Sequence, residues 1–480
     1  MNELREECGV FGVYSPDRYD IARTVYYGLF ALQHRGQESC GIVVNDDGVL
    51  SSYKDLGIVN DVFTPDRLAE LGEGRIAIGH VRYGTMGINS RINAQPITVN
   101  HIKGSMGLAH NGSLVNSHEL RRELELEGSI FQTTSDTEVI AYMITKERLR
   151  TNSIEEAIDS AMNRIKGAYS LVIVSPTKLV AARDEFGFRP LCYGVTKDGT
   201  YVVASESCAL DTVSAELVRD IEPGEIVIFD DNGIRTIDHH CGKQEKKICI
   251  FEYIYFSRPD SVVDGVSVHL ARVHAGETLA QDYPVDADVV VGVPDSGLDA
   301  AIGYSRESGL PYGIGFIKNK YIGRTFIAPG QSKREKLVNI KLNVVKETVA
   351  GKRVVLIDDS AVRGTTSKRI VKKLRDAGAK EVHLRLTAPP FIDACYYGTD
   401  VSDRSTLIAA NHTLEEIREI IGCDSIGFLK TERLREMIGR TDDKGYCSAC
   451  FDSNYPAGRA AESGKFKFEC KLSEKIKKEN

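Results

Sequence analysis

The 480-residue sequence has no long hydrophobic run, no excess of basic residues and no apolar leader at its start. No stretch approaches the roughly 18 to 20 apolar residues that a membrane-spanning helix requires. The opening segment MNELREECGV is acidic and lacks the apolar core of a secretory signal. The formal net charge of -7 provides neither a positive field for nucleic acid nor a polybasic membrane anchor. We therefore expect a cytoplasmic protein that binds neither nucleic acid nor a membrane.

The composition is otherwise that of an ordinary globular protein, with 42% hydrophobic and 27% charged residues. The length leaves room for about two to four domains. The sequence contains 11 cysteines, whose roles depend on the redox compartment. A reducing compartment argues against a disulfide framework, so we expect metal ligands, nucleophiles or core residues among them.

The first half of the chain shows strand and helix patterns in mixed order. Strand-like runs lie at residues 8–14, 75–83, 168–174, 178–183, 201–205 and 225–229. Helical patterns lie at residues 19–33, 117–127 and 137–150. The polar stretch 230–247, whose Asp-Asn-Gly suits a tight turn, is the clearest domain boundary.

In the second half, strands alternate regularly with helices. Strands are predicted at residues 288–293, 353–357 and 381–386, and helical runs begin at Asp299 and Thr366. This alternation is typical of a parallel sheet that binds ligands at the carboxyl ends of its strands. Residues 461–480 are rich in lysine and are expected to form a solvated tail.

The segment 354–366, VVLIDDSAVRGTT, joins a buried strand to a helix. Asp358 and Asp359 follow the apolar strand, and small, hydroxyl-bearing residues come next. Backbone N–H groups at a helix start, together with hydroxyls, form a cradle for a phosphate. Two carboxylates beside such a cradle suit ribose hydroxyls and a divalent cation. Taken alone, an acidic pair at a strand end is often an ordinary loop.

The whole segment resembles the phosphoribosylpyrophosphate (PRPP) signature of type I phosphoribosyltransferases. That resemblance implies one Mg²⁺ per subunit, surrounded by Asp358, Asp359 and Ser296, the last within the pyrophosphate-loop string VPDSG at 293–297. It also implies a phosphate-binding loop, made by Ser360, Arg363, Gly364, Thr365 and Thr366.

The basic, glycine-containing segment 318–345 is either a solvated loop or a lid over the pyrophosphate. A lid would protect an oxocarbenium-like transition state from water. Its candidate residues are Lys318, Lys320, Tyr321 and Arg324.

Five strings in the first half resemble the class II glutamine amidotransferases. They are CGVFG at 8–12, QHRGQ at 33–37, HVRYGT at 80–85, HNG at 110–112 and SDTE at 135–138. The resemblance makes Cys8 the nucleophile and gives the oxyanion hole to the Asn111 side chain and the Gly112 N–H. Arg82 would bind the glutamine α-carboxylate and Asp136 its α-ammonium group.

The nucleophile of that family is the first residue of the chain. A terminal amine, with a pKa of about 7.7 to 8.0, can act as general base for the thiol of the same residue. Seven residues precede Cys8 here. We therefore expect residues 1–7 to be a propeptide that is cut off between Glu7 and Cys8; the alternative is a misassigned start codon.

Cys447 and Cys450 form a CxxC, and Cys249 and Cys395 lie in segments that resemble one branch of the glutamine PRPP amidotransferases. In that branch the resemblance implies one [4Fe–4S] cluster per subunit. Four thiolates satisfy either a cubane cluster or a tetrahedral zinc, so ligand type alone does not separate the two. The other cysteines are interpreted as core or surface residues: Cys40, Cys192, Cys208, Cys241, Cys423 and Cys470.

Together these resemblances identify the sequence as similar to the glutamine PRPP amidotransferases over nearly its whole length. They imply a four-layer αββα N-terminal-nucleophile hydrolase domain at 8–235 and a type I phosphoribosyltransferase domain at 248–460. The implied reaction hydrolyses glutamine at Cys8 and passes ammonia internally to PRPP, giving 5-phosphoribosylamine, pyrophosphate and glutamate. It is the first committed step of purine synthesis. The family further implies a homotetramer with purine nucleotides as feedback inhibitors.

Two other functions share part of this pattern. Glucosamine-6-phosphate synthase has the glutaminase half but lacks the DDSAVRGTT string. A regulator that senses PRPP has that string, but it lacks the N-terminal nucleophile domain and usually needs a DNA-binding element, which we do not find.

Overall fold

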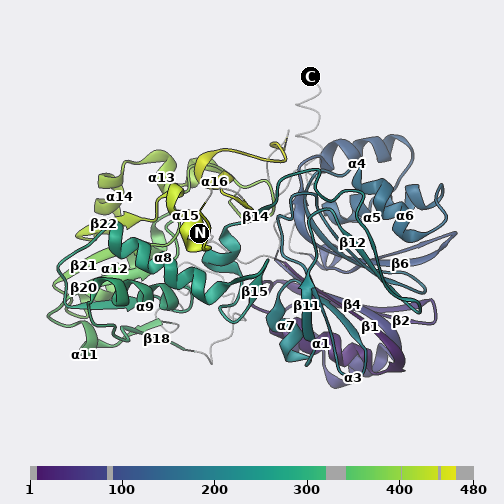
Figure 1. Cartoon of the computed structure of the whole chain (residues 1–480), viewed down its shortest axis with the longest axis horizontal. Helices are drawn as coiled ribbons and strands as arrows, with labels where there is room; N and C mark the ends of the chain where they lie inside the picture. Colours follow the sequence, from purple (N-terminus) through teal and green to yellow (C-terminus); the bar gives the residue numbers. More distant parts are fainter. Residues whose placement is uncertain (1–7, 84–89, 320–341, 402, 442–444, 461–480) are drawn as a thin grey trace.

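The computed structural model describes residues 8–83, 90–319, 342–401, 403–441 and 445–460. The two halves of the chain lie side by side (Figure 1), the first in purple to blue-teal and the second in teal-green to yellow. Within the described residues, no helix is long and apolar enough to cross a membrane.

The first half is built on two antiparallel sheets. Seven strands form one sheet, in the order β11(Glu216–Asp220), β9(Cys192–Val195), β10(Tyr201–Ala204), β1(Gly9–Tyr19), β4(Gly74–Arg82), β2(Ser39–Asp46) and β3(Val49–Leu56). Six strands form the other, in the order β13(Gly233–Ile237), β12(Ile226–Asp230), β8(Leu179–Arg183), β7(Gly167–Val174), β6(Gly104–Leu114) and β5(Ile97–His101).

The two sheets pack face to face through a hydrophobic core that includes Val10, Ile78, Ala109 and Val172. The contact is so close that a Cβ added at Gly12 would lie 2.6 Å from Cγ1 of Val172. This tight fit explains a glycine in the middle of a central strand.

Helices cover the outer face of each sheet. Those on the seven-stranded sheet are α1(Ile21–Ala31), α2(Val59–Val62), α3(Pro65–Glu70) and α7(Ser207–Thr212). Those on the six-stranded sheet are α4(Ser117–Leu126), α5(Asp136–Arg148) and α6(Ile154–Met162). Figure 1 shows α1 and α3 below the sheets and α4, α5 and α6 above them. The predicted αββα order of layers is confirmed.

The structure differs from the sequence prediction in several details, and β5, β6, β9, β11, α6 and α7 are among the elements that the prediction lacked. β1 continues to Tyr19, which pairs with Gly74 of β4 across a register shift, so α1 starts only at Ile21. Strand pairing therefore overrides the helical periodicity at Tyr19, and Asp20 is the residue that precedes the helix. The polar stretch 230–247 contains the predicted tight turn, but it also contains the paired strand β13. The hairpin of β2 and β3 is a further pair that the prediction omitted.

The second half contains a four-stranded parallel sheet. Its order is β17(Val289–Gly292), β20(Arg353–Asp358), β21(Glu381–Leu386) and β22(Ser425–Phe428). Alternate side chains of one strand enter different cores: Val355 packs with α8(Val268–Asp282) and α9(Gly297–Ser308), while Val354 packs with α12(Thr365–Asp376) and α14(Leu414–Ile421). Burial on both faces is typical of parallel strands and confirms the predicted βα arrangement.

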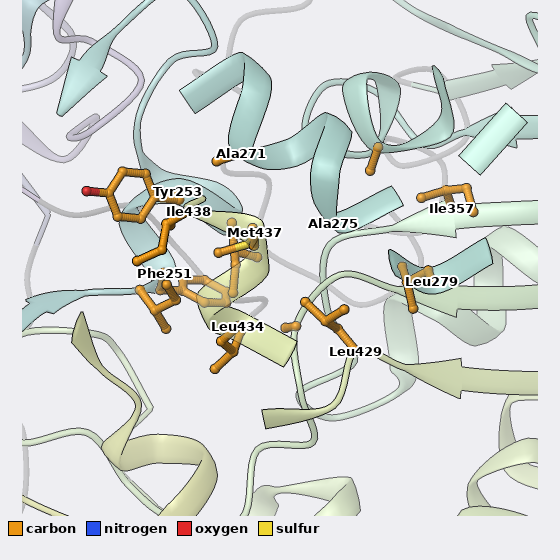
Figure 2. Close-up of a cluster of buried hydrophobic side chains, with 14 of the residues drawn as sticks. Phe251, Tyr253, Ala271, Ala275, Leu279, Ile357, Leu429, Leu434, Met437 and Ile438 are labelled. Atoms are coloured by element: carbon orange, nitrogen blue, oxygen red, sulfur yellow. The ribbon is translucent and has the colours of Figure 1, made fainter. Parts of the chain in front are cut away.

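Figure 2 shows part of the first of these cores. Phe251 and Tyr253 lie there with Ala271 and Ala275 of α8 and with Leu434 and Met437 of α15(Leu434–Met437). Phe251 and Tyr253 flank the start of a short π-helix, η2(Glu252–Phe256). This segment, which links the two halves, is therefore anchored in the core of the second half.

Short elements complete the described fold. They are η1(Arg91–Asn93), β14(Lys247–Cys249), β15(Val262–Val263), β16(Val266–Ser267), β18(Phe316–Lys318), β19(Leu342–Val344), α11(Lys346–Val349), η3(Arg404–Thr406), α13(Ile408–Asn411), η4(Thr431–Arg433), β23(Gly445–Cys447) and α16(Ala449–Asp452).

The C-terminal part of the chain returns to the segment that joins the two halves. β14 pairs in parallel with β23, and Cys249 lies opposite Cys447 in that register. A small core there combines Ala168 and Phe188 of the first half with Tyr397 and Ala449 of the second. The domain limits at 235, 248 and 460 remain predictions, and β13 runs two residues beyond the first of them. Residues 1–7 and 461–480, including Cys470, lie outside the described residues.

Candidate active sites

The first candidate site is a pocket at the start of β1, where Cys8 lies. Four residues predicted from the sequence share its lining, namely Cys8, Arg82, Gly112 and Asp136. The other lining residues are Tyr83, Gln95, His110, Ser135 and Thr137. The Cys8 thiol donates a hydrogen bond to the carbonyl oxygen of Tyr83 at 3.3 Å, and the residue is 8% exposed. The pocket thus unites segments separated by more than a hundred residues of chain.

Asn111 lies on β6 next to Gly112 and is completely buried. Within the described part of the chain, neither its Nδ2 nor its Oδ1 has a hydrogen-bond partner. Buried polar groups are nearly always paired, because leaving one unpaired costs about 1 to 3 kcal/mol. An amide donor without a partner beside a cysteine pocket is the arrangement that an oxyanion hole requires before substrate arrives.

Gly112 adopts a backbone conformation that other residues avoid. Its φ is +136°, and an added Cβ would lie 2.2 Å from the carbonyl oxygen of Ala168. The close approach of β7 and the positive φ together require glycine at this position. The local geometry therefore explains the glycine, whatever its backbone N–H does in catalysis.

Asp136 begins α5 and is almost fully buried. Its Oδ2 accepts a hydrogen bond from the backbone N–H of Leu114 at 2.9 Å. Ser135 caps the same helix by accepting from Thr137 N. This fixed carboxylate faces a pocket that also contains the buried Arg82, so the pocket offers one charge of each sign, as an α-amino acid requires.

Two buried histidines near the pocket received no role from the sequence. His80 Nε2 lies 3.0 Å from the carbonyl oxygen of His110, and burial lowers the pKa of His80 to about 3. Burial also lowers the pKa of His110. Both rings are therefore neutral near pH 7. Gln95 and Tyr83 were also missed; only Tyr83 falls within a recognised string.

The second candidate site lies at the carboxyl end of β20. Asp359 accepts hydrogen bonds from the hydroxyls of Ser296 at 2.7 Å and Ser360 at 2.5 Å. Asp358 is 5% exposed, and its Oδ1 accepts from the backbone N–H of Asp359 at 3.0 Å. Ser296 comes immediately before α9, so the structure brings together the two strings that the sequence analysis paired.

The segment after Asp359 leads into α12. Gly364 precedes this helix with a φ of +72°, and Thr365 and Thr366 form its exposed first turn. Arg363 donates to the hydroxyl of Thr406 at 3.4 Å. Ser296 comes just before α9, and Asp359 begins the loop that leads into α12. Backbone N–H groups at helix starts favour anions.

Of the predicted lid residues, only Lys318 falls within the described part of the chain. It ends β18 and forms an ion pair with Asp295 of the VPDSG string. Lys320, Tyr321 and Arg324 lie outside the described residues.

The four predicted cluster ligands gather where β14 meets β23. The carbonyl of Cys450 accepts from the backbone N–H groups of Ile392 at 3.0 Å and Asp393 at 3.2 Å, which draws the CxxC to the segment containing Cys395. Cys395 Sγ accepts from the N–H of Tyr397 at 3.4 Å. Burial, reinforced by the neighbouring cysteines of the set, raises the pKa of Cys447 and Cys450 well above the usual value.

Among the described residues, no group of three or more Cys, His, Asp or Glu side chains is arranged so that it could hold a metal ion. Of the remaining cysteines, Cys40, Cys192, Cys208 and Cys423 are buried and Cys241 is partly exposed.

Comparisons with known proteins identify both halves of the chain. A glutamine amidotransferase domain model matches residues 80–212, and a phosphoribosyl transferase domain model matches residues 269–389. The amidophosphoribosyltransferase of Methanocaldococcus jannaschii is 50% identical over 463 residues, which cover 94% of this chain and 97% of the relative.

Two solved structures share the whole architecture. The glutamine PRPP amidotransferase of B. subtilis, complexed with ADP and GMP, is 46% identical with a TM-score of 0.88, covering 95% of this chain and 99% of the other. A structure described as the allosteric regulatory enzyme of purine biosynthesis is also 46% identical, with a TM-score of 0.90, and covers 97% of this chain and 100% of the other. The chain therefore belongs to the amidophosphoribosyltransferases, the glutamine-dependent PRPP amidotransferases of purine biosynthesis.

Proposed function

We propose that Cys8 carries out the glutamine half-reaction of this enzyme in the pocket of the first half. The observation that carries this assignment is the buried, unpartnered amide of Asn111 beside the cysteine pocket. Sγ of Cys8 attacks the side-chain amide carbon, and the oxyanion that forms accepts hydrogen bonds from Asn111 Nδ2 and Gly112 N–H. Ammonia leaves, a γ-glutamyl thioester remains, and water hydrolyses it to glutamate.

The general base in this proposal is the α-amine of Cys8. The two nearby histidines, His80 and His110, are held neutral by burial, and both rings contact backbone carbonyls: His80 that of His110, and His110 that of Ala168. A free amine at Cys8 exists only after cleavage between Glu7 and Cys8, so we propose that residues 1–7 are a propeptide. The amine takes the thiol proton and later donates a proton to the departing ammonia.

Arg82 and Asp136 are proposed to select glutamine by its α-carboxylate and α-ammonium groups. Both side chains are buried, and Asp136 is held by the Leu114 N–H. Because the pocket offers one cationic and one anionic group, an amide without the amino-acid end would form an ion pair with neither of them. That loss is the physical basis of selectivity.

We propose that PRPP binds at the end of β20. The loop of Ser360, Arg363, Gly364, Thr365 and Thr366 would hold its 5-phosphate, and Asp358 and Asp359 would face the ribose and the cation. Carboxylate and hydroxyl oxygens are the ligands that Mg²⁺ prefers, so Asp358, Asp359 and Ser296 fit one Mg²⁺ per subunit. When bound, Mg²⁺ neutralises charge on the departing pyrophosphate. Ammonia attacks C1 of PRPP as the C1–O bond to pyrophosphate breaks, giving 5-phosphoribosylamine.

The four cysteines at the β14–β23 junction are proposed to hold one [4Fe–4S] cluster. Cys249 lies opposite Cys447 in the register of β14 and β23, which brings the segment before the transferase core next to the CxxC. The N–H of Tyr397 already donates to Cys395 Sγ, as donors to cluster sulfurs do. The role is structural, because the reaction transfers no electrons.

The remaining features of the enzyme are proposed from its relatives and its sequence. The B. subtilis structure contains ADP and GMP, which supports feedback inhibition of this chain by purine nucleotides. Assembly as a homotetramer, a cytoplasmic location and closure of a lid formed by Lys318, Lys320, Tyr321 and Arg324 are proposals of the same kind. So are domain limits at 8–235 and 248–460 and a lysine-rich tail at 461–480.

The two half-reactions can be tested separately. Cys8→Ser in processed enzyme should abolish use of glutamine but leave synthesis from high ammonia largely intact. Asn111→Ala should lower glutamine-dependent turnover by about 10²- to 10³-fold, the usual loss for one oxyanion donor. Synthesis from ammonia should again be unaffected. Both rates are measured on folded protein whose start at Cys8 is verified by mass. Equal loss of both activities in Cys8→Ser would mean that the two half-reactions do not use separate sites.

A further inference from the structure

Arg35 connects the main chain of Cys8 to two buried carboxylates. Its side chain has no exposed surface. Nε donates to the carbonyl oxygen of Cys8 at 3.0 Å. Nη1 donates to Glu206 Oε1 at 2.6 Å and Glu252 Oε2 at 2.9 Å, and Nη2 donates to Glu252 Oε1 at 2.8 Å. The sequence placed Arg35 within QHRGQ and assigned it no role.

Glu252 comes from the second half of the molecule. It opens η2, and its neighbours Phe251 and Tyr253 are packed in the second-half core (Figure 2). The carboxylate is fully buried and also lies 3.3 Å from Nη1 of Arg189 and 2.8 Å from the hydroxyl of Ser257. A rigid element of the second half therefore reaches the residue that holds Cys8.

We propose that Glu252 is a positioning residue for glutamine hydrolysis: its carboxylate fixes the Arg35 guanidinium, which in turn fixes the main chain of Cys8. The inference rests on the proposed role of Cys8 as nucleophile. A bidentate carboxylate orients a planar guanidinium in two directions at once, which a single hydrogen bond does not.

The charges within this network support the assignment. Although burial alone would lower the pKa of Arg35, Glu252 and Glu206 together raise it above the ordinary value. Glu252 remains ionised despite burial because Arg35 and then Arg189 lower its pKa. If Glu252 lost its charge, the cation of Arg35 would be shared between Glu206 and a neutral group, and its Nε would no longer be aimed at Cys8.

Two hydrogen bonds of Cys8 bear on where its sulfur lies. Its carbonyl is held by Arg35, and its thiol donates to the carbonyl of Tyr83. A shift of about 1 Å in a reacting group can cost on the order of 10²-fold in rate. Loosening the first anchor should therefore slow the chemical step more than it weakens glutamine binding, because Arg82 and Asp136 are not part of the network.

The chain contains a matched control for a buried ion pair between the halves. Arg183 at the end of β8 donates to both carboxylate oxygens of Asp264, each at 2.9 Å, and the two side chains are 0% and 4% exposed. Its remaining donors reach the carbonyls of Ile221, Gly187 and Arg189, and none of these residues lines the Cys8 pocket. Asp264 has a φ of +49°, a conformation that asparagine tolerates.

The experiment compares Glu252→Gln and Asp264→Asn in the full-length, processed enzyme. For each, kcat and KM for glutamine, ammonia-dependent synthesis and Tm are measured. Glu252→Gln should lower glutamine kcat by about 10- to 100-fold, up to the cost of a 1 Å displacement. KM for glutamine and the ammonia reaction should stay close to wild type. Asp264→Asn should lower Tm but preserve both activities, and Glu252→Asp, which keeps the charge, should restore part of the lost kcat.

Four results would decide against the proposal or its premise. Glu252 would be merely structural if Glu252→Gln had a normal kcat for glutamine. The same would follow if Glu252→Gln and Asp264→Asn each lost glutamine-dependent and ammonia-dependent activity to the same extent. Should Glu252→Gln not fold, Arg35→Lys keeps the charge but loses the forked donors; normal glutamine kcat there also overturns the proposal. If Cys8→Ala retained glutaminase activity, the premise that Cys8 is the nucleophile would be wrong. If Cys8→Ala were inactive but Glu252→Gln had a normal kcat for glutamine, only the positioning role would be rejected.

Discussion

The acidic pair at the end of β20 allows a sharp test of the PRPP site. Asp358→Asn and Asp359→Asn preserve side-chain shape. The backbone N–H of residue 359 can still donate to the amide oxygen introduced at position 358, and the Ser296 and Ser360 hydroxyls can rotate to pair with an amide at position 359. The fold should therefore survive, while two negative charges are removed from the proposed ribose and Mg²⁺ site.

The expected cost is catalytic. Loss of one preorganised electrostatic group lowers turnover by about 10²- to 10³-fold, or about 2.7 to 4 kcal/mol. The double variant should lose at least this much but less than the sum, because neighbouring groups that act on one substrate are not additive. Pyrophosphate release from PRPP and ammonia measures this loss. Glutaminase activity measured without PRPP should persist, because the Cys8 pocket lies in the other half.

Asp288 provides the control, since it is an acidic residue beside the same sheet at the opposite end of the strands. It pairs with Arg353 at the start of β20. Asp288→Asn should leave synthesis near the wild-type rate. Near-normal synthesis in the folded Asp358/Asp359 double variant would mean that the transferase site lies elsewhere, and equal loss in Asp288→Asn would mean that the effect is not local.

Three further predictions concern maturation, the metal and pH. Intact-mass measurement of active enzyme should show a chain that begins at Cys8, and Met1 or Asn2 on fully active enzyme would contradict the propeptide. Anaerobically purified protein should be brown, contain about four irons per chain and lose activity and solubility together in air. Colourless, air-stable enzyme with one zinc per chain would show that the ligand set is right and the metal wrong. Full activity in a Cys447/Cys450 double variant would show that there is no metal site. Burial holds the pKa of His80 at about 3, so the unfolded state binds its proton first as pH falls from about 6.5, and stability should decrease through that window toward pH 3. The decrease, followed as Tm against pH, should be smaller in His80→Asn, and an identical pH profile would exclude His80 as its source.

The predictable part of this fold is the part in which strand, loop and helix are consecutive in the sequence. β20, Asp358, Asp359 and α12 form one uninterrupted segment, so local pattern and ligand chemistry predict the same site. The β2–β3 hairpin could also have been predicted, because Asp47-Gly48 is a typical hairpin turn pair. In the structure both residues have the positive φ that such a turn requires. It was missed because β3 is an edge strand with mostly polar, partly exposed side chains.

The contacts of Arg35 could not be predicted from one sequence. Its partners Glu206 and Glu252 lie 171 and 217 residues away. A carboxylate in a sequence carries no mark that it will be buried, let alone which arginine it will meet. The same holds for Tyr83, whose hydroxyl donates to Asp400 at 2.9 Å across the two halves. Sequence strings nominate the residues proposed to contact substrate, whereas the residues that position them depend on tertiary pairing.

The two halves meet through buried ion pairs, and these are poorly suited to providing net stability. Removing two charges from water costs several kcal/mol for each ion, so Arg35–Glu252 and Arg183–Asp264 contribute little more than apolar side chains of the same size would. Apolar contacts, however, tolerate sliding, while a bidentate ion pair allows one geometry. Of the two pairs, Arg35–Glu252 also reaches the main chain of Cys8, so it can transmit the position of the second half to the proposed nucleophile. The other donors of Arg183 end on carbonyls of residues outside the Cys8 pocket, so loss of the Arg183–Asp264 pair should cost stability but not turnover.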